Sequence, residues 1–302
     1  MACVLTIGNF DGVHLGHQQI LALGRKLADE AGVPLVAKTF DRHPAQLLKP
    51  EEAPPVLLTV DQRVRWLKHF GADRVDVMPM TTDALGEPAE AFVERMVRES
   101  RPIAFAEGPD FRFGHQRGGD NDLLKTMGER LSFATHVIEP VAVDLSEEKP
   151  VRVSSSLLRR LLEQGRVEDA ERCLGRPFAL TAEVVQGEQR GRTIGVPTAN
   201  LDPVALAGIL VPAHGVYAGR AQVQIDGAAT EFDAAISVGV KPTFGHQQLT
   251  VEAHLFELPV GTDLYGQPIT LLFERWIRPQ MAFADAAELI AQIEQDLQAC
   301  RR

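Results

Sequence analysis

The sequence predicts two domains of different fold class, an α/β domain over residues 1–180 and an antiparallel β-barrel with a terminal helix over residues 181–302. In the first half, short apolar runs alternate with helix-like segments, which is typical of a parallel sheet with helices on both faces. From residue 179 onward the apolar segments are short and alternating, with Gly and Pro turns at near-regular intervals, as in barrels. The length of 302 residues suffices for two ordinary domains.

The composition is that of a globular protein and argues against several classes of function. Hydrophobic residues make up 45% and charged residues 24%, and no apolar run approaches the length of a membrane span. The N-terminus lacks the basic start and apolar core of a signal peptide. The net charge of −10 disfavours a general nucleic-acid binder but not a nucleotide ligand. Cys3, Cys173 and Cys300 are odd in number and far apart, which argues against disulfides or a zinc site and fits a reducing cytoplasm.

Strands and helices of the α/β domain are expected to follow one another in order. We expect strands at residues 4–7, 33–40, 75–79, 103–106 and 134–143, and helices at residues 18–31, 61–70, 89–99 and 121–131. Residues three or four apart mark each helix, and Val64, Leu67 and Lys68 lie near one face of the second. Gly71 is suited to cap that helix, and the Pro-rich residues 47–58 are expected to form a loop.

Two helices, a series of barrel strands and a last helix complete the expected order. A leucine-rich helix follows Ser156, and the next helix spans Val167 to Leu174 with Gly175 as its cap. We expect barrel strands at residues 180–186, 216–224, 232–238, 249–257 and 268–274. The segment from Asp285 to Ala299 is amphipathic and is expected to pack on the barrel as a terminal helix.

The stretch from Gly8 to His17 joins the first strand to the first helix. Such a turn directs backbone N–H groups and a helix N-terminus at an anion above the sheet. His14 and His17 are three residues apart, so they share a face if the helix begins here. Two imidazoles in that place can stabilise the charge that develops during phosphoryl transfer. A histidine pair alone is more often structural or part of a metal site, whereas the ten-residue string is more specific.

Three further segments of the first domain admit both a functional and an ordinary interpretation. Residues Thr39–Pro44 follow a strand at the edge where open α/β sheets bind ligands, but Asp and Pro also form ordinary turns. The Gly-rich, Arg-bearing residues 107–120 could wrap a phosphate or form a surface loop. Three serines at residues 154–156 precede a helix that carries Arg159, and they could form a simple N-cap, for which one serine suffices, or a phosphate cradle.

The barrel domain contains a group of residues of its own. A Gly/Arg loop at residues 187–195 is not a Walker P-loop, yet with Thr198 and Asn200 after it, it could hold phosphates and Mg²⁺. A barrel hairpin with a Pro corner is the alternative. Glu252 shares a strand face with Thr250 and His254, although a lone strand glutamate is usually just solvated.

These strings together resemble a known family. G-x-F-D-x-x-H-x-G-H at residues 8–17 resembles the HxGH signature of nucleotidyltransferases, and in this long form bacterial FAD synthetase, the bifunctional riboflavin kinase/FMN adenylyltransferase. F-D-x-H-P at 40–44, G-x-D-F-x-F-G at 108–114 and S-S-S-L-L-R at 154–159 resemble further elements, with Ser156 and Leu158 replacing the usual Thr and Ile. P-T-A-N-L at 197–201 and strings at 215–219, 239–245, 263–266 and 277–279 resemble riboflavin kinase. The resemblance implies a Rossmann-like first domain.

The resemblance also implies roles for individual residues. In AMP transfer the catalytic residues would be His14, His17 and Arg159, and ATP would contact Gly8, Asn9, Phe10, Asp11, Gly16, Asp110, Arg152, Ser155 and Ser156. The flavin of that reaction would contact Phe40, His43 and Pro44. In the kinase, Glu252 would be the general base, and ATP and Mg²⁺ would contact Gly191, Arg192, Gly195, Pro197, Thr198 and Asn200, with Thr198 on the metal. Arg278 would contact the kinase's flavin.

The activity implied is the synthesis of flavin nucleotides in two steps. The barrel would phosphorylate riboflavin to FMN, and the α/β domain would adenylylate FMN to FAD with release of pyrophosphate. Mg²⁺ would be the cofactor and ATP the co-substrate. We expect riboflavin, FMN and ATP as partners, with no nucleic acid, no membrane and no obligate protein partner.

Two other functions are compatible with parts of the sequence. One is an HxGH enzyme that adenylylates or cytidylylates another acceptor, against which the kinase strings argue. The other is a non-catalytic flavin-binding protein, against which the joint presence of His17, Arg159 and Glu252 argues. Only seven residues precede Gly8, fewer than the family usually carries, so we expect a missing edge piece of the sheet or a shortened start.

Overall fold

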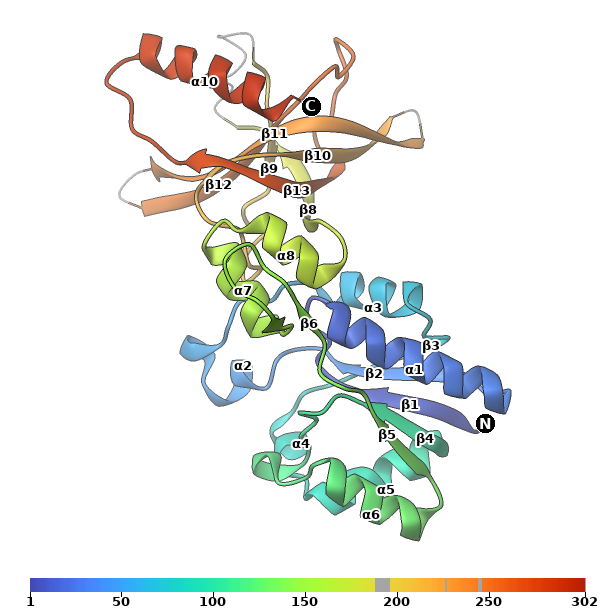
Figure 1. The fold of residues 1–302 in the computed structure, drawn as a ribbon. Coiled ribbons are helices and arrows are strands. Elements are labelled where there is room, and N and C mark those ends of the chain that lie inside the picture. The colour runs from blue at the N-terminus through green and yellow to red at the C-terminus, as the bar shows by residue number, and fades with distance from the viewer. Residues whose placement is uncertain (188–195, 226, 244–245, 302) are drawn as a thin grey trace. The chain divides into compact units, whose positions relative to one another are not determined.

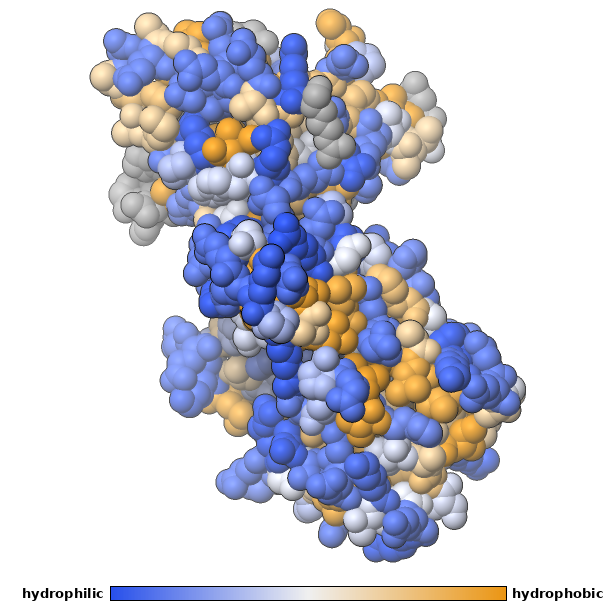
Figure 2. All heavy atoms as spheres, viewed as in Figure 1, coloured by the Kyte–Doolittle hydropathy of each residue, from blue (hydrophilic) through white to orange (hydrophobic). Residues whose placement is uncertain are grey.

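The computed structural model describes residues 1–187, 196–225, 227–243 and 246–301 (Figure 1). The chain forms two compact units, Met1–Ser155 and Ser156–Arg302. The domain boundary expected at residue 180 stays a prediction. Among the helices described, none combines the length and apolar character needed to cross a lipid bilayer. The face of the molecule in Figure 2 is mostly hydrophilic, and hydrophobic residues gather on it over the first unit around helix α1 (Leu15–Ala31).

The first unit is built on a five-stranded sheet in the order β3-β2-β1-β4-β5, with all neighbours parallel. Its strands are β1 (Cys3–Ile7), β2 (Leu35–Phe40), β3 (Arg74–Met78), β4 (Pro102–Glu107) and β5 (Ala134–Val137). The strand order reverses between β1 and β4, and open α/β sheets bind ligands beyond the carboxyl ends of strands at such a point. The predicted α/β fold is confirmed.

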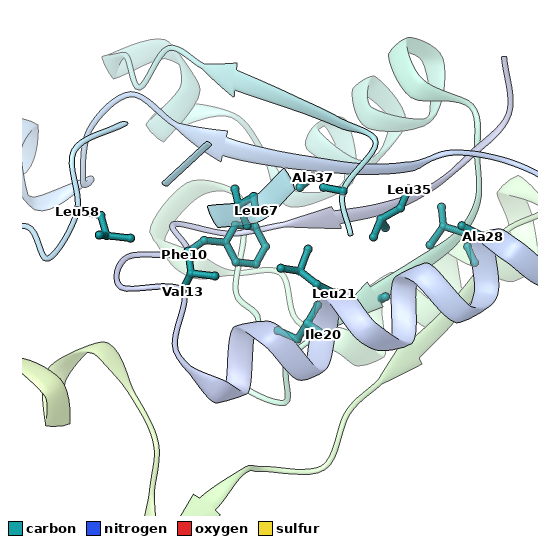
Figure 3. Close-up of a cluster of buried hydrophobic side chains, with 13 residues drawn as sticks. Phe10, Val13, Ile20, Leu21, Ala28, Leu35, Ala37, Leu58 and Leu67 are labelled. Carbon is teal, nitrogen blue, oxygen red and sulfur yellow. The ribbon is translucent and has the colours of Figure 1, made fainter. Parts of the chain in front are cut away.

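Helices cover both faces of this sheet, because successive strand residues point to opposite faces. They are α1, α2 (Ala45–Leu48), α3 (Val60–His69), α4 (Thr82–Gly86), α5 (Ala89–Ser100) and α6 (Asn121–Leu131), with 3-10 turns η1 (Pro50–Glu52) and η2 (His115–Arg117). Val4 of β1 belongs to one apolar cluster with Leu21 of α1 and Leu67 of α3, and Figure 3 labels the two leucines. Leu5, the next residue, belongs to a second cluster with Met96 of α5.

One expected strand of this unit is divided in the structure. Residues 134–143 form β5 and then β6 (Ala142–Val143), which pairs antiparallel with β7 (Val151–Arg152) in a separate small sheet. Pro140 lies between β5 and β6, and proline has no N–H to donate to a strand ladder. Pro140 therefore explains the division, which the apolar pattern of residues 134–143 did not predict.

The second unit is a closed barrel with the strand order β10-β11-β12-β9-β8-β13. Its strands are β8 (Phe178–Val185), β9 (Ala199–Leu201), β10 (Gly215–Ile225), β11 (Ala228–Thr243), β12 (His246–Leu255) and β13 (Pro268–Pro279), and its helices are α7 (Ser155–Glu163), α8 (Val167–Leu174) and α10 (Ala286–Cys300). Helix α7 begins at Ser155, so the division between the units falls in its first turn. The predicted antiparallel barrel with a terminal helix is confirmed, and β9 is a strand that we did not expect.

Tyr217 is a fully buried aromatic residue of the barrel. Its ring meets the rings of Phe273 and Trp276 edge-on, with centroids 5.1 and 5.0 Å apart, an arrangement worth about 1 kcal/mol per pair beyond burial. The Tyr217 hydroxyl donates to the carbonyl of Ala213 at 2.5 Å. Cys300 of α10 packs with apolar residues of the barrel wall, so the terminal helix covers the barrel as expected.

Candidate active sites

The turn after β1 has an unusual backbone. Phe10 and Val13 adopt φ angles of 48° and 41°, and Gly12 lies between them at 86°. Positive φ is strained for a β-branched residue, and such residues concentrate at functional sites. Both Phe10 and Val13 are buried in the apolar cluster of Figure 3, and this packing holds the turn in its strained form.

The structure brings His14 and His17 together at the start of α1. His14 is the N-cap of the helix, and its Nδ1 accepts the backbone N–H of His17 at 3.4 Å. The two rings stack with centroids 3.7 Å apart. Because Nδ1 of His14 accepts, the neutral ring carries its proton on Nε2. Gly16 leaves room for this ring, since a Cβ there would lie 3.1 Å from Cε1 of His14.

His17 is held in its neutral form. Burial lowers its pKa well below the usual 6.5, and electrostatic interactions with His14 and with the Arg63 guanidinium lower it further. Its Nδ1 atom is buried and has no hydrogen-bond partner among the residues that the structure describes. At neutral pH the imidazole is therefore a hydrogen-bond donor rather than a cation.

Arg63 of α3 is a buried residue of this region that the sequence analysis missed. Its Nη1 donates to the carbonyl of Asn9 at 2.7 Å and to Oγ1 of Thr39 at 3.1 Å. Its Nε and Oδ1 of Asn9 are buried without a partner within the described part of the chain. In this helix Arg63 is buried together with Leu67, while Lys68 is exposed. The four-residue spacing of Arg63 and Leu67 was the available signal.

Asp11 fastens the turn to the segment before α3. Its carboxylate accepts the backbone N–H groups of Leu57 at 3.0 Å and Leu58 at 3.1 Å, and the side chain is buried. The carbonyl of Asp11 accepts the hydroxyl of Ser155 at 2.8 Å. The carboxylate expected to contact ATP is thus engaged in holding the backbone.

The other residues predicted for AMP transfer lie at or after strand ends, or on α7. Gly8 donates its N–H to the carbonyl of Lys38 at 3.0 Å. Phe40 ends β2, and Nδ1 of His43 accepts the N–H of Ala45 at 3.1 Å, just before Pro44 starts the turn into α2. Asp110 and Arg152 form an ion pair between the loop after β4 and β7. Ser156 and Arg159 lie on α7, one turn apart.

Glu107 is a second buried polar residue that the sequence analysis did not select. It ends β4 at the reversal of strand order, is 1% exposed, and accepts the N–H of Ile7 on Oε1 at 2.9 Å. Burial raises the pKa of this carboxyl well above its usual 4.5, and the bond from Ile7 only partly opposes the shift. A charged residue closing the apolar run A-F-A-E was the signal that could have found it.

The barrel brings Thr198, Asn200 and Glu252 together from distant parts of the sequence. Glu252 of β12 faces Asn200 of β9 in the antiparallel register. The Thr198 hydroxyl donates to Oε2 of Glu252 at 3.2 Å, and the Asn200 amide donates to the Thr198 carbonyl at 3.4 Å. Gly187 permits this approach, because a Cβ there would lie 2.5 Å from Oδ1 of Asn200.

The other residues predicted for the kinase site make contacts elsewhere or lie outside the described part of the chain. Pro197 is exposed, and its carbonyl lies 2.8 Å from Nδ1 of His254. Nε and Nη2 of Arg278 donate to the carboxylate of Asp296 at 2.7 and 2.6 Å, which joins β13 to α10. The predicted contacts Gly191, Arg192 and Gly195 lie outside the described residues.

Comparisons with known proteins agree for both halves of the chain. The family model for FAD synthetase matches residues 1–157, and that for riboflavin kinase matches residues 174–302. The chain is 36% identical over 301 residues to the bifunctional riboflavin kinase/FMN adenylyltransferase of Pseudomonas fluorescens, covering 99% of this chain and 92% of the relative. It is 35% identical over 296 residues to the enzyme of that name from Escherichia coli strain K12, covering 97% and 90%.

Among solved structures, a macrolide-efflux protein from Streptococcus pneumoniae is similar in fold. The TM-score is 0.86 at 27% identity, and the match covers 100% of this chain and 94% of that chain. The two family models, in this order, and the identity to full-length relatives lead to one assignment. The chain belongs to the family of bifunctional riboflavin kinases/FMN adenylyltransferases, with an N-terminal FAD synthetase domain and a C-terminal riboflavin kinase domain.

Proposed function

We propose that this chain carries out the two reactions of its family in sequence, each at one of the two groups of residues described above. The barrel transfers the γ-phosphate of ATP to the 5′-hydroxyl of riboflavin, which yields FMN and ADP. The α/β domain transfers AMP from a second ATP to the phosphate of FMN, which yields FAD and pyrophosphate. The observation that supports this most directly is the meeting of Thr198, Asn200 and Glu252 on the barrel.

AMP transfer needs no protein nucleophile, because a phosphate oxygen of FMN attacks the α-phosphorus while pyrophosphate leaves. The N–H groups at the start of α1 and the rings of His14 and His17 stabilise the negative charge of the triphosphate. Neutral His17 acts there as a hydrogen-bond donor. Ser155, Ser156 and Arg159 hold the departing pyrophosphate with hydroxyl groups and a guanidinium.

The other residues of the α/β domain shape the surroundings of the two ligands. The backbone of the turn approaches ATP closely, and Asp110 and Arg152 border the nucleotide. The turn residues that contact ATP are Gly8, Asn9, Phe10, Asp11 and Gly16. Phe40, His43 and Pro44 border the flavin. The family resemblance supports these roles, and the strained turn supports a ligand above it.

In the kinase reaction, Glu252 accepts the proton of the riboflavin hydroxyl as that oxygen attacks the γ-phosphorus. The Thr198 hydroxyl and the Asn200 amide oxygen are hard oxygen groups that fit Mg²⁺, with Thr198 as the ligand. When held there, Mg²⁺ would supply positive charge that neutralises the phosphates. The ATP contacts are completed by Gly191, Arg192, Gly195 and Pro197, and Arg278 contributes to flavin binding.

We infer that both reactions take place in the cytoplasm. Cys3, Cys173 and Cys300 are buried free thiols, and burial raises the pKa of Cys173 and Cys300 to about 11. Unpaired protonated thiols suit a reducing compartment. The partners are riboflavin, FMN and ATP, and the proposal includes no nucleic acid and no obligate protein partner.

A chromatographic time course with riboflavin, ATP and Mg²⁺ tests the proposed function. FMN should appear first and then be converted to FAD. Omission of Mg²⁺ should suppress FMN formation. FMN alone would contradict the assignment of the first domain, and no flavin product at all would contradict both assignments.

A further inference from the structure

His254 lies on β12 two residues after Glu252 and on the same face of the strand. Its Nδ1 is 2.8 Å from the carbonyl oxygen of Pro197. Because a carbonyl oxygen can only accept, this Nδ1 carries a proton and donates it. The ring also meets Phe256 edge-on, with centroids 5.3 Å apart, so its orientation is restricted.

The bond from His254 lies where the strand ladder ends. The register between β9 and β12 pairs Asn200 with Glu252 and Ala199 with Ala253, and no further pair follows toward Pro197 among the described residues. The next position on β12 is His254, which bonds to residue 197 through its side chain rather than through its backbone. Two side-chain bonds from β12 thus hold residues 197–198, one from His254 and one through Glu252.

We propose that His254 is a positioning residue of the kinase reaction, which fixes the Pro197–Thr198 segment against β12. It touches neither the reacting hydroxyl nor the phosphate in the mechanism above, so it acts through Thr198 and Glu252. Holding Thr198 in place keeps the metal ligand and the general base at a constant separation, and small displacements of such groups are costly. The proposal rests on the proposed kinase function.

Two substitutions whose new side chains have the same shape as each other separate the effect of the hydrogen bond from the effect of side-chain size. His254→Asn places an amide N–H close to the position of the ring Nδ1–H, so it retains the donor. His254→Asp has the same shape but presents an oxygen that repels the Pro197 carbonyl. We expect His254→Asp to lower kcat and raise the KM for MgATP, with a total loss in kcat/KM of about 10- to 100-fold.

His254→Asn should stay within about threefold of the unchanged protein in kcat/KM. Conversion of added FMN to FAD serves as the internal control in each variant, because it takes place in the other domain and should not change. Equal losses in both variants, or no loss in His254→Asp, would overturn the positioning role. A loss of FAD synthesis as well would also contradict it, since the effect would then be general.

Amide hydrogen exchange of the full chain provides a readout that does not depend on activity. Backbone amides of Thr198, Ala199 and Asn200 should exchange faster in His254→Asp than in His254→Asn and the unchanged protein. Equal exchange in all three proteins would overturn the proposal. If the unchanged protein phosphorylates no riboflavin, the proposed kinase function fails, and the exchange result still decides whether His254 holds this segment.

Discussion

His17 shows at the residue scale how neighbours control protonation. Burial lowers its pKa most, followed by the electrostatic interactions with His14 and with the Arg63 guanidinium. Because the folded form binds a proton less readily than the unfolded chain, protonation favours unfolding. Above pH 6.5 the His17 ring is neutral in both states, and this destabilisation is absent. As the pH falls below 6.5, the unfolded chain binds the proton first, so the free energy of unfolding of the first unit decreases.

Replacing Arg63 by methionine should raise the pKa of His17, because one of the positive charges that lower it is removed. The pKa should remain below 6.5, since burial, the largest cause, persists. Arg63→Lys keeps the charge and is the matched control, for which we expect a pKa close to that of the unchanged protein. An NMR titration of the His17 ring, assigned with a His17→Gln variant, measures this. An unchanged pKa in Arg63→Met would show that Arg63 does not act on His17.

At the element scale, helix α10 is joined to the barrel by the pair of Arg278 and Asp296. Both side chains are largely buried, at 16% and 9% exposure, and the bonds are bidentate. Charge-assisted bidentate pairs are among the stronger hydrogen-bonded contacts, and loss of one partner leaves a buried charge. The attachment of α10 should therefore depend on this pair.

Asp296→Asn should lower the free energy of unfolding of the barrel by about 2 kcal/mol, because Arg278 loses its counter-charge. Asp285→Asn is the matched control on the same helix. Asp285 is the N-cap, and asparagine caps as well as aspartate, so stability should not change. Urea unfolding with hydrogen exchange in α10 measures both. Equal stability of Asp296→Asn and the unchanged protein would contradict this role of the pair.

Elements with a clear apolar period were predictable from the sequence, and the short ones were not. The helix at 89–99 agrees with α5, whereas α4 is too short to show a helical period. Strand β9 has three residues and follows a proline, so its alternation is too brief to recognise. One of its two partners, β12, begins more than forty residues further along, so that pairing depends on the tertiary fold.

At the scale of the whole molecule, the motifs predicted the kinds of site better than their side-chain contacts. The strings around His14 and Glu252 indicated the two chemistries, since we propose that those residues take part in them. The bond of Asp11 to Leu57 and the burial of Glu107 depend on segments that meet only in the folded chain. The roles that we propose for Arg63 and His254 depend on such contacts, so no local sequence pattern predicted them.

The central claim is that one chain holds two independent active sites, and two single variants test it most directly. His17→Ala should reduce conversion of FMN to FAD by at least about 100-fold while riboflavin is still converted to FMN. Glu252→Gln should reduce FMN formation by at least about 100-fold while added FMN is still converted to FAD. Both conversions are measured by chromatography on each variant, with folding verified by circular dichroism. Loss of both reactions in either folded variant would contradict the account.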